Sequence, residues 1–266
     1  MKSWQVLKIW GIPLRIHPLW ILLIIFFAWS ISNQINLTLS ETFDVKDSFF
    51  IGFSTSLLFF GSIIFHQFFH TIVSLKNGVK IRNITFVLLG ATLQIDKECQ
   101  NPLGNIKIAL VRPISCLLTS SLLIYLSNFS QSSNQILINI FLRVGIFNLF
   151  LCLINLIPIG SLDGGILFKS IVWKLSGSKY KGRNQLNRLT LLLSIFAFFF
   201  GIYCFLIFNF YYGLIFFLFG ILGINTSQSE NQFLKIERIL KDRNISEIKL
   251  IPLRKIDFDL TLKEFQ

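Results

Sequence analysis

Residues 65–70 read Phe65-His66-Gln67-Phe68-Phe69-His70, and they lie near the end of the second long apolar run of the chain. The chain has three histidines, and two of them stand here four residues apart. On an α-helix, residues i and i+4 project from one face, so the two imidazoles could hold one metal ion. The stretch therefore predicts a membrane helix that carries two candidate metal ligands.

The composition indicates a membrane protein. Of the 266 residues, 53% are hydrophobic and 14% are charged, whereas a soluble domain carries about 25% charged residues. The formal net charge of +12 is not gathered into a basic stripe with interleaved aromatic residues, so we expect no nucleic-acid partner. The four cysteines lack the spacing of a disulfide framework or a thiolate zinc site.

Six apolar runs approach the length of about 20 residues that a helix needs to span a bilayer. The last two form one long apolar stretch that Asn209 interrupts, and we expect a tight polar turn there. The runs cover residues 18–35, 49–75, 106–126, 136–157, 189–207 and 210–224. We therefore predict an all-α polytopic membrane protein with about six transmembrane helices.

The distribution of Lys and Arg predicts the orientation, because cytoplasmic loops carry the excess of these residues. The leader, the second and fourth connections and the tail are rich in them, whereas the third and fifth connections have none. Both termini are therefore expected in the cytoplasm. In this topology the second helix places His66 and His70 toward its cytoplasmic end, and the fourth helix ends on the same side just before Asp163.

Two further segments complete the predicted organisation. Residues 79–96 are rich in β-branched residues and broken once at Gly90, which predicts a small membrane-associated β-hairpin, with a soluble loop as the alternative. We expect a membrane-embedded domain over residues 1–226 and a short basic cytoplasmic tail over residues 227–266. Within that tail, residues 231–243 are a candidate amphipathic helix that contacts lipid, and a solvated tail is the alternative.

Asp163 is the third candidate metal ligand. A hydrolytic zinc site has three protein ligands and one open position for water, and His66 and His70 supply two. Each part alone has a simpler interpretation, with the histidines as hydrogen-bonded core residues and Leu-Asp-Gly-Gly as a turn. The shared depth and side favour one zinc site of His66, His70 and Asp163. The third histidine, His17, is expected to lie at the membrane interface instead.

These motifs resemble those of the site-2 protease family of intramembrane zinc metalloproteases. Residues 66–70 are similar to the family's H-E-x-x-H motif. Residues 155–165 are similar to its N-x-x-P…L-D-G motif, and the resemblance covers residues 10–224.

The resemblance implies zinc bound by His66, His70 and Asp163, with Asn155 as an oxyanion donor. It also implies that the substrate is a transmembrane helix of a client protein, presented in extended form by the strands within residues 79–96. We therefore expect a multi-pass protein of an internal membrane, such as the bacterial inner membrane, whose partners are client helices and lipid.

Several residues depart from the family pattern. Gln67 stands where members carry the general-base Glu, and Val111-Arg112-Pro113 stands where Ala-Gly-Pro is usual. Ser161 and Ile166 replace a usual Pro and a frequent Arg. An amide cannot take up a proton at neutral pH, and general acid–base help is worth about 10²–10⁴ in rate. Because Gln is close to isosteric with Glu, the departure at Gln67 predicts an intact zinc site with weak or absent proteolysis.

Arg112 and Arg143 are charges inside predicted membrane helices. Each of them either pairs with a polar partner inside the bundle or extends its charged end toward the membrane surface. The sequence leaves both alternatives open.

Three functions compete. The first is an impaired relative that binds zinc and transmembrane helices, and the second is a working intramembrane metalloprotease with a base from elsewhere. The third is a metal transporter, which ranks last because transport favours ionisable residues staged along several helices, whereas the candidate ligands here collect at one level.

Overall fold

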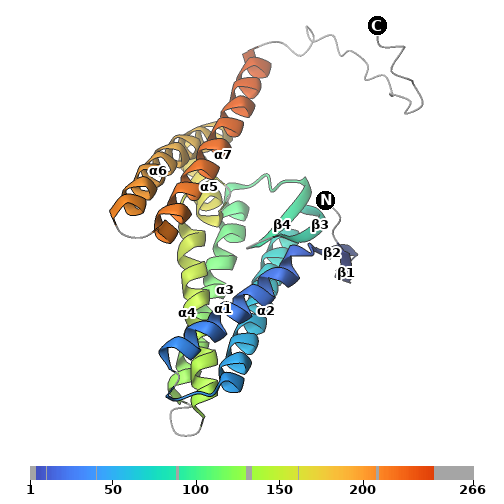
Figure 1. Cartoon of the computed structure of the whole chain (residues 1–266). Helices are drawn as coiled ribbons and strands as arrows, with labels where there is room; N and C mark the ends of the chain where they lie inside the picture. The colour runs from blue at the N-terminus through green and yellow to red at the C-terminus, as the bar shows by residue number, and fades with distance from the viewer. Residues whose placement is uncertain are drawn as a thin grey trace, which may run out of the picture.

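The structure is a computed structural model that describes residues 4–9, 11–39, 41–87, 90–129, 134–160, 162–207 and 210–242. The expected turn at Asn209, the substituted Ser161 and the last part of the expected tail lie outside these residues. The described elements, shown in Figure 1, are β1 (Trp4–Ile9), β2 (Ile12–Ile16), α1 (Leu19–Thr38), α2 (Val45–Lys76), β3 (Lys80–Val87), β4 (Gly90–Lys97), α3 (Pro102–Phe129), α4 (Gln135–Leu156), α5 (Asp163–Ser176), α6 (Lys179–Ile207) and α7 (Phe210–Asp242).

Each of the six apolar runs lies in a helix. Among the described residues, five helices are long and apolar enough to cross a membrane: α1, α2, α3, α4 and α6. The sixth run is the first half of α7, which continues without a break into charged residues as far as Asp242. A multi-pass membrane protein is therefore supported, while the count of six spans and the cytoplasmic termini stay predictions.

Helix α2 is the central helix of the bundle that α1–α4 form. Half of its most apolar window is buried, against 22% to 28% in the other four candidate spans. It packs against α1, α3 and α4. On the outside of the bundle, α1 exposes large apolar side chains such as Leu22, Phe26 and Trp29, as expected of a surface that contacts lipid.

The sheet is larger than the predicted hairpin. Residues 79–96 do form the hairpin β3–β4, but the N-terminal leader adds β1 and β2, giving the order β1-β2-β3-β4. Strands β2 and β3 are parallel, with Leu14 opposite Ile84, because α1 and α2 carry the chain back between them. The predicted all-α class with one hairpin is therefore corrected to a mostly helical fold with a four-stranded mixed sheet.

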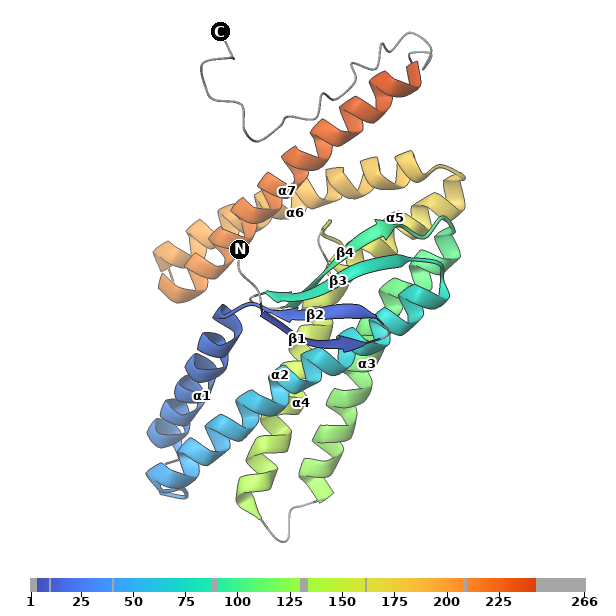
Figure 2. The ribbon, with the colours of Figure 1, turned by 90° about the vertical axis from the view of Figure 1, so that its right-hand side faces the viewer.

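The sheet lies against the bundle at one end, beside α1 and α2 (Figure 2). Its apolar residues Ile12, Leu14 and Ile84 are buried in one cluster with Trp20 of α1. The Trp20 ring lies 5.1 Å from that of Phe60 and 4.8 Å from that of Phe86, measured between centroids. This apolar contact joins the sheet to the helix that carries the histidine pair.

The remaining helices lie beyond the same end of the bundle (Figures 1 and 2). The fourth connection, expected only as a basic loop, contains α5, which begins at Asp163 and is followed by Gly177 with φ of 68°. Helices α6 and α7 pack along each other, and α6 also packs against α5. Arg183 of α6 forms ion pairs with Glu230 and Glu237 of α7 at 2.7 and 3.0 Å. The expected boundary between residues 226 and 227 falls inside α7, so the two-part division stays a prediction.

Candidate active site

The centre of the candidate site is one buried face of α2. His66, Gln67 and His70 are 1%, 3% and 4% exposed. The helical spacing of four residues places both imidazoles on one face, as predicted. Gln67, at the position where the sequence resemblance expects a general base, therefore lies inside the protein and away from lipid.

His66 belongs to a buried polar cluster that includes two other helices. Its Nε2 donates to Asn148 Oδ1 of α4 at 2.7 Å, and its Nδ1 lies 3.0 Å from Ser115 Oγ of α3. Asn148 Oδ1 also accepts from Ser62 Oγ at 2.9 Å, and Asn148 Nδ2 donates to the carbonyl of Val144. Both ring nitrogens of His66 are therefore engaged with neutral polar side chains.

Arg112 of α3 links the histidine helix to α5. Its Nη2 donates to Gln67 Oε1 at 2.9 Å, and its Nη1 forms an ion pair with Asp163 Oδ2 at 3.0 Å. The Asp163 side chain is 3% exposed and that of Arg112 is 20% exposed. Of the two alternatives for Arg112, pairing inside the protein is the one observed.

Close packing at the start of α5 sets the position of Asp163. A Cβ added at Gly164 would meet the carbonyl oxygen of Leu156, and one added at Gly165 would meet that of Ile159. Only glycine allows the first turn of α5 to lie this close to the end of α4. The Gly-Gly pair therefore holds Asp163 within reach of Arg112.

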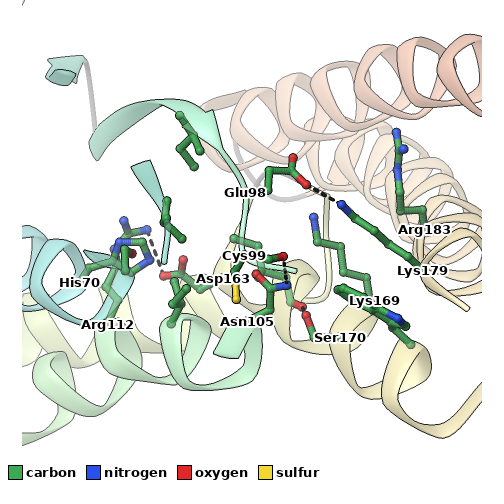
Figure 3. A pocket seen from close by; sticks show the side chains of 16 residues that line it. His70, Glu98, Cys99, Asn105, Arg112, Asp163, Lys169, Ser170, Lys179 and Arg183 are labelled. Carbon is green, nitrogen blue, oxygen red and sulfur yellow. Dashed lines mark hydrogen bonds and ion pairs between the residues drawn. The ribbon is translucent and has the colours of Figure 1, made fainter. Parts of the chain in front are cut away.

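A cavity of about 350 Å³ extends from this site between α5, α6 and the connection after β4 (Figure 3). His70, Arg112 and Asp163 lie at one end, and three cations, Lys169, Lys179 and Arg183, lie at the other. Lys179 Nζ lies 2.7 Å from Glu98 Oε2, and the hydrogen bond it donates lowers the pKa of Glu98.

Burial also affects the charge of this cavity. It lowers the pKa of Lys169, because the protein interior disfavours the charged amine. The two lining carboxylates, Glu98 and Asp163, each have a basic partner. The lining of the cavity thus has four Lys and Arg side chains and two carboxylates, so basic side chains outnumber acidic ones.

A second, small pocket of about 40 Å³ reaches Gln67 from the side of the sheet. Apart from Gln67 and Thr71 its lining is apolar, and it lies between α2 and strands β2 and β3. The lining residues are Leu14, Ile64, Gln67, Phe68, Thr71, Ile84 and Phe86. Gln67 thus lies between an apolar pocket and the Arg112 guanidinium.

The residues as arranged do not fit a zinc ion. Zinc needs at least three protein ligands with free donor atoms, and the described residues contain no group of three or more His, Cys, Asp or Glu side chains placed to hold a metal. His66 has both nitrogens engaged, and Asp163 is paired with Arg112. Within the described part of the chain, both ring nitrogens of His70, Nε2 of Gln67 and Oδ2 of Asp163 are buried without a hydrogen-bond partner.

Zinc binding by His66, His70 and Asp163 therefore stays a prediction of the sequence. It would require Arg112 to leave Asp163 and His66 to give up one partner. Asn155 is buried on α4, two turns after Asn148 and on the same face, and its role as an oxyanion donor also stays a prediction.

The other singled-out residues lie outside this centre. His17 Nδ1 accepts from the backbone N–H of Leu19 at 3.3 Å, at the start of α1. Arg143 Nη1 donates to Gln34 Oε1 at 3.2 Å. Arg143, which is half-buried, therefore has a polar partner as well, but that partner, Gln34, is exposed.

The sequence interpretation missed Ser115 and Asn148 as partners of His66. A signal existed for Asn148, which is a polar residue in the middle of an apolar run and stands seven residues before Asn155 on one helix face. Ser115 stands three residues after Arg112, but serine is too common in membrane helices to mark a site.

Comparison with known proteins gives a consistent set of relatives. Residues 110–200 match the model of Peptidase family M50, a segment that includes Arg112 and Asp163 but not the histidine pair. The protein named "Putative zinc metalloprotease sll0528" of Synechocystis sp. is 31% identical over 180 residues, which are 67% of this chain and 46% of that protein. Zinc metalloprotease MJ0392 of Methanocaldococcus jannaschii is 29% identical over 179 residues, which are 66% of this chain and 47% of that protein.

The chain thus spans about half the length of the curated relatives it matches. Their names imply zinc use among the relatives. The solved structure of a site-2 protease from Methanocaldococcus jannaschii superimposes with a TM-score of 0.56 over 86% of this chain and 95% of that chain. At 22% sequence identity this likeness shows a shared fold.

Proposed function

The chain belongs to peptidase family M50, the family of the site-2 proteases, and from this membership we propose that it binds segments of other membrane proteins. The bound segment is a transmembrane helix of a client protein, unwound beside Gln67. The protein holds this segment without cutting it. Lipid is its second partner, in contact with the exposed apolar side chains of the helices.

The observation that carries this proposal is the position of Gln67. Its amide is buried at the general-base position and is hydrogen-bonded to Arg112. An amide cannot accept the proton of an attacking water or return it to a leaving amine. The carboxylate of Asp163 is held by the same arginine in an ion pair at 3.0 Å. Both features favour binding over hydrolysis.

The sheet and the small pocket support the binding part of the proposal. Strand β4 is an edge of the four-stranded sheet, and an open edge can pair with an extended peptide. The pocket lined by Ile64, Gln67 and Phe68 offers an apolar space for a side chain of such a peptide. The pocket lies between α2 and strands β2 and β3, whereas Ile95 of β4 lines the larger cavity.

A working metalloprotease is the second candidate, and one observation favours it. His70 has two buried ring nitrogens without a partner within the described residues, as expected of a ligand that awaits a metal ion. This candidate needs Arg112 to move away and a base other than Gln67.

The test uses the full chain in lipid vesicles with a test substrate that contains one transmembrane helix. A photo-crosslinking amino acid replaces Ile64, which lines the small pocket, and in a matched control it replaces Leu192, which is 66% exposed on α6. We expect substrate adducts at position 64 exceeding those at position 192, with no cleavage product by mass spectrometry. Zinc-dependent cleavage by the unmodified protein, or equal adducts at both positions, would contradict the proposal.

A further inference from the structure

We infer that the guanidinium of Arg112 is the resident cation of this site and takes the place that a zinc ion would need. The protein then folds without metal, with Asp163 paired to Arg112. The inference does not rest on the binding of a client, because a client could be held beside either cation. Metal content and crosslinking are separate measurements, so the two proposals can fail independently.

The first support is the choice of partners. Arg112 contacts Gln67, at the position of the general base, and Asp163, the third ligand expected from the sequence. These are the residues that would face a catalytic metal and its water. Two departures from the family pattern, at Gln67 and at Arg112, thus contact each other across two helices.

The second support is the balance of charge. Among the described residues, Asp163 is the carboxylate that forms an ion pair with Arg112, and one guanidinium neutralises it. Adding Zn²⁺ beside Arg112 would place three positive charges against one negative charge in a buried site, which is strongly unfavourable. Glu in place of Gln67 would supply a second carboxylate, whereas the neutral amide of Gln67 supplies none.

The third support is the shape of the donor. A guanidinium is planar and presents its N–H groups as a fixed fork, so one side chain can bind two acceptors on different elements. Arg112 uses Nη2 for a hydrogen bond to Gln67 at 2.9 Å and Nη1 for an ion pair with Asp163 at 3.0 Å. It joins α2, α3 and α5 at one point, the structural task that a metal ion performs in other proteins.

The test compares zinc content in detergent-purified protein without a polyhistidine tag. The variants are the double substitution Arg112→Gly with Gln67→Glu, and Arg143→Gly as a matched loss of another arginine of the bundle. After incubation with zinc and removal of the excess, we expect the wild type and the Arg143→Gly variant to hold no specific zinc. The double variant should hold about one zinc ion per chain, and that zinc should be lost when His70→Ala is added.

Two results would overturn the inference. One is a wild type that holds a stoichiometric zinc ion that His70→Ala removes. The other is a double variant that keeps its size-exclusion profile and gains no zinc. If the double variant does not fold, the wild type alone decides: we expect its thermal midpoint to be unchanged by a strong chelator, whereas a fall in the midpoint, restored by zinc, would overturn the inference.

Discussion

Arg112 Nη2 of α3 lies 2.9 Å from Gln67 Oε1 of α2, so two of the positions that depart from the family pattern are in direct contact. The same guanidinium neutralises Asp163 at 3.0 Å. Gln67, which stands at the position of the base, and Arg112, which brings a cation, are therefore joined by direct contact. The contact gives the buried carbonyl oxygen of the Gln67 side chain a hydrogen-bond donor.

A glutamate at position 67 should not by itself give the protein proteolytic activity. In the single variant Gln67→Glu, the new carboxylate is expected to pair with Arg112, because a charged acceptor strengthens the existing hydrogen bond. The measurement is cleavage of the vesicle-bound test substrate with zinc present, beside an active reference protease. Zinc-dependent cleavage by Gln67→Glu would show that Arg112 does not block the site.

Removing the arginine should destabilise the protein. Arg112→Met leaves Asp163 buried without its cation, and breaking a buried ion pair in this way costs roughly 3–5 kcal/mol. We expect a clear fall in the thermal midpoint, and Asp163→Asn added to Arg112→Met should recover part of it, because the remaining group is then neutral. Arg143→Met is the control, since its bond to Gln34 is exposed and its loss should cost less than about 1 kcal/mol. Additive effects of the two site substitutions would argue against coupling between Arg112 and Asp163.

The glycine pair at the start of α5 should tolerate no side chain. A Cβ at Gly165 would meet the backbone of Ile159, and overpacking of this kind costs about 1–3 kcal/mol or more. We expect Gly165→Ala to lower the thermal midpoint. Gly61→Ala is the matched control, because a Cβ at that position of α2 meets nothing within 4 Å and should be neutral or stabilise by up to about 1 kcal/mol. Equal midpoints for both variants would show that α5 does not need this close approach.

The ion pair between Glu98 and Lys179 should give a pH-dependent contribution to stability. The hydrogen bond from Lys179 lowers the pKa of Glu98 in the folded protein, so the contribution is fully present above the ordinary pKa of 4.5 and is lost as the pH falls through the lower folded value. We expect Glu98→Gln and Lys179→Met to lower the thermal midpoint slightly at pH 7, and the differences from wild type to shrink below pH 4.5. Differences that grow toward acid pH would contradict this assignment.

The helices could be predicted from the sequence because a membrane span fixes both the length and the apolar character of a segment. The hairpin of β3 and β4 could also be predicted, because Gly90 divides two runs of β-branched residues. Strands β1 and β2 could not be predicted. Their place in the sheet depends on the parallel pairing of Leu14 with Ile84, a contact between segments separated by two helices. Helix α5 was missed because its charged residues resemble a basic loop.

At the site, the sequence predicted a cluster of His66, His70 and Asp163, whereas the structure places His70 and Asp163 on one cavity with Arg112 and gives His66 other partners. The histidine spacing required a shared helix face, and the matched depth of α2 and α5 brought Asp163 near it. The rotation of α3, which turns Arg112 toward Gln67 and Asp163, depends on how three helices pack together. A pattern along one chain segment carries no information about that rotation.

The most direct test of Arg112 as the cation of this site is an experimental structure of zinc-incubated wild-type protein, with anomalous diffraction collected at the zinc absorption edge. We expect no anomalous peak at the site, and density that joins the Arg112 guanidinium to Gln67 and Asp163. A peak within about 2.0–2.2 Å of a nitrogen of His66, a nitrogen of His70 and an oxygen of Asp163, with Arg112 turned away, would contradict it.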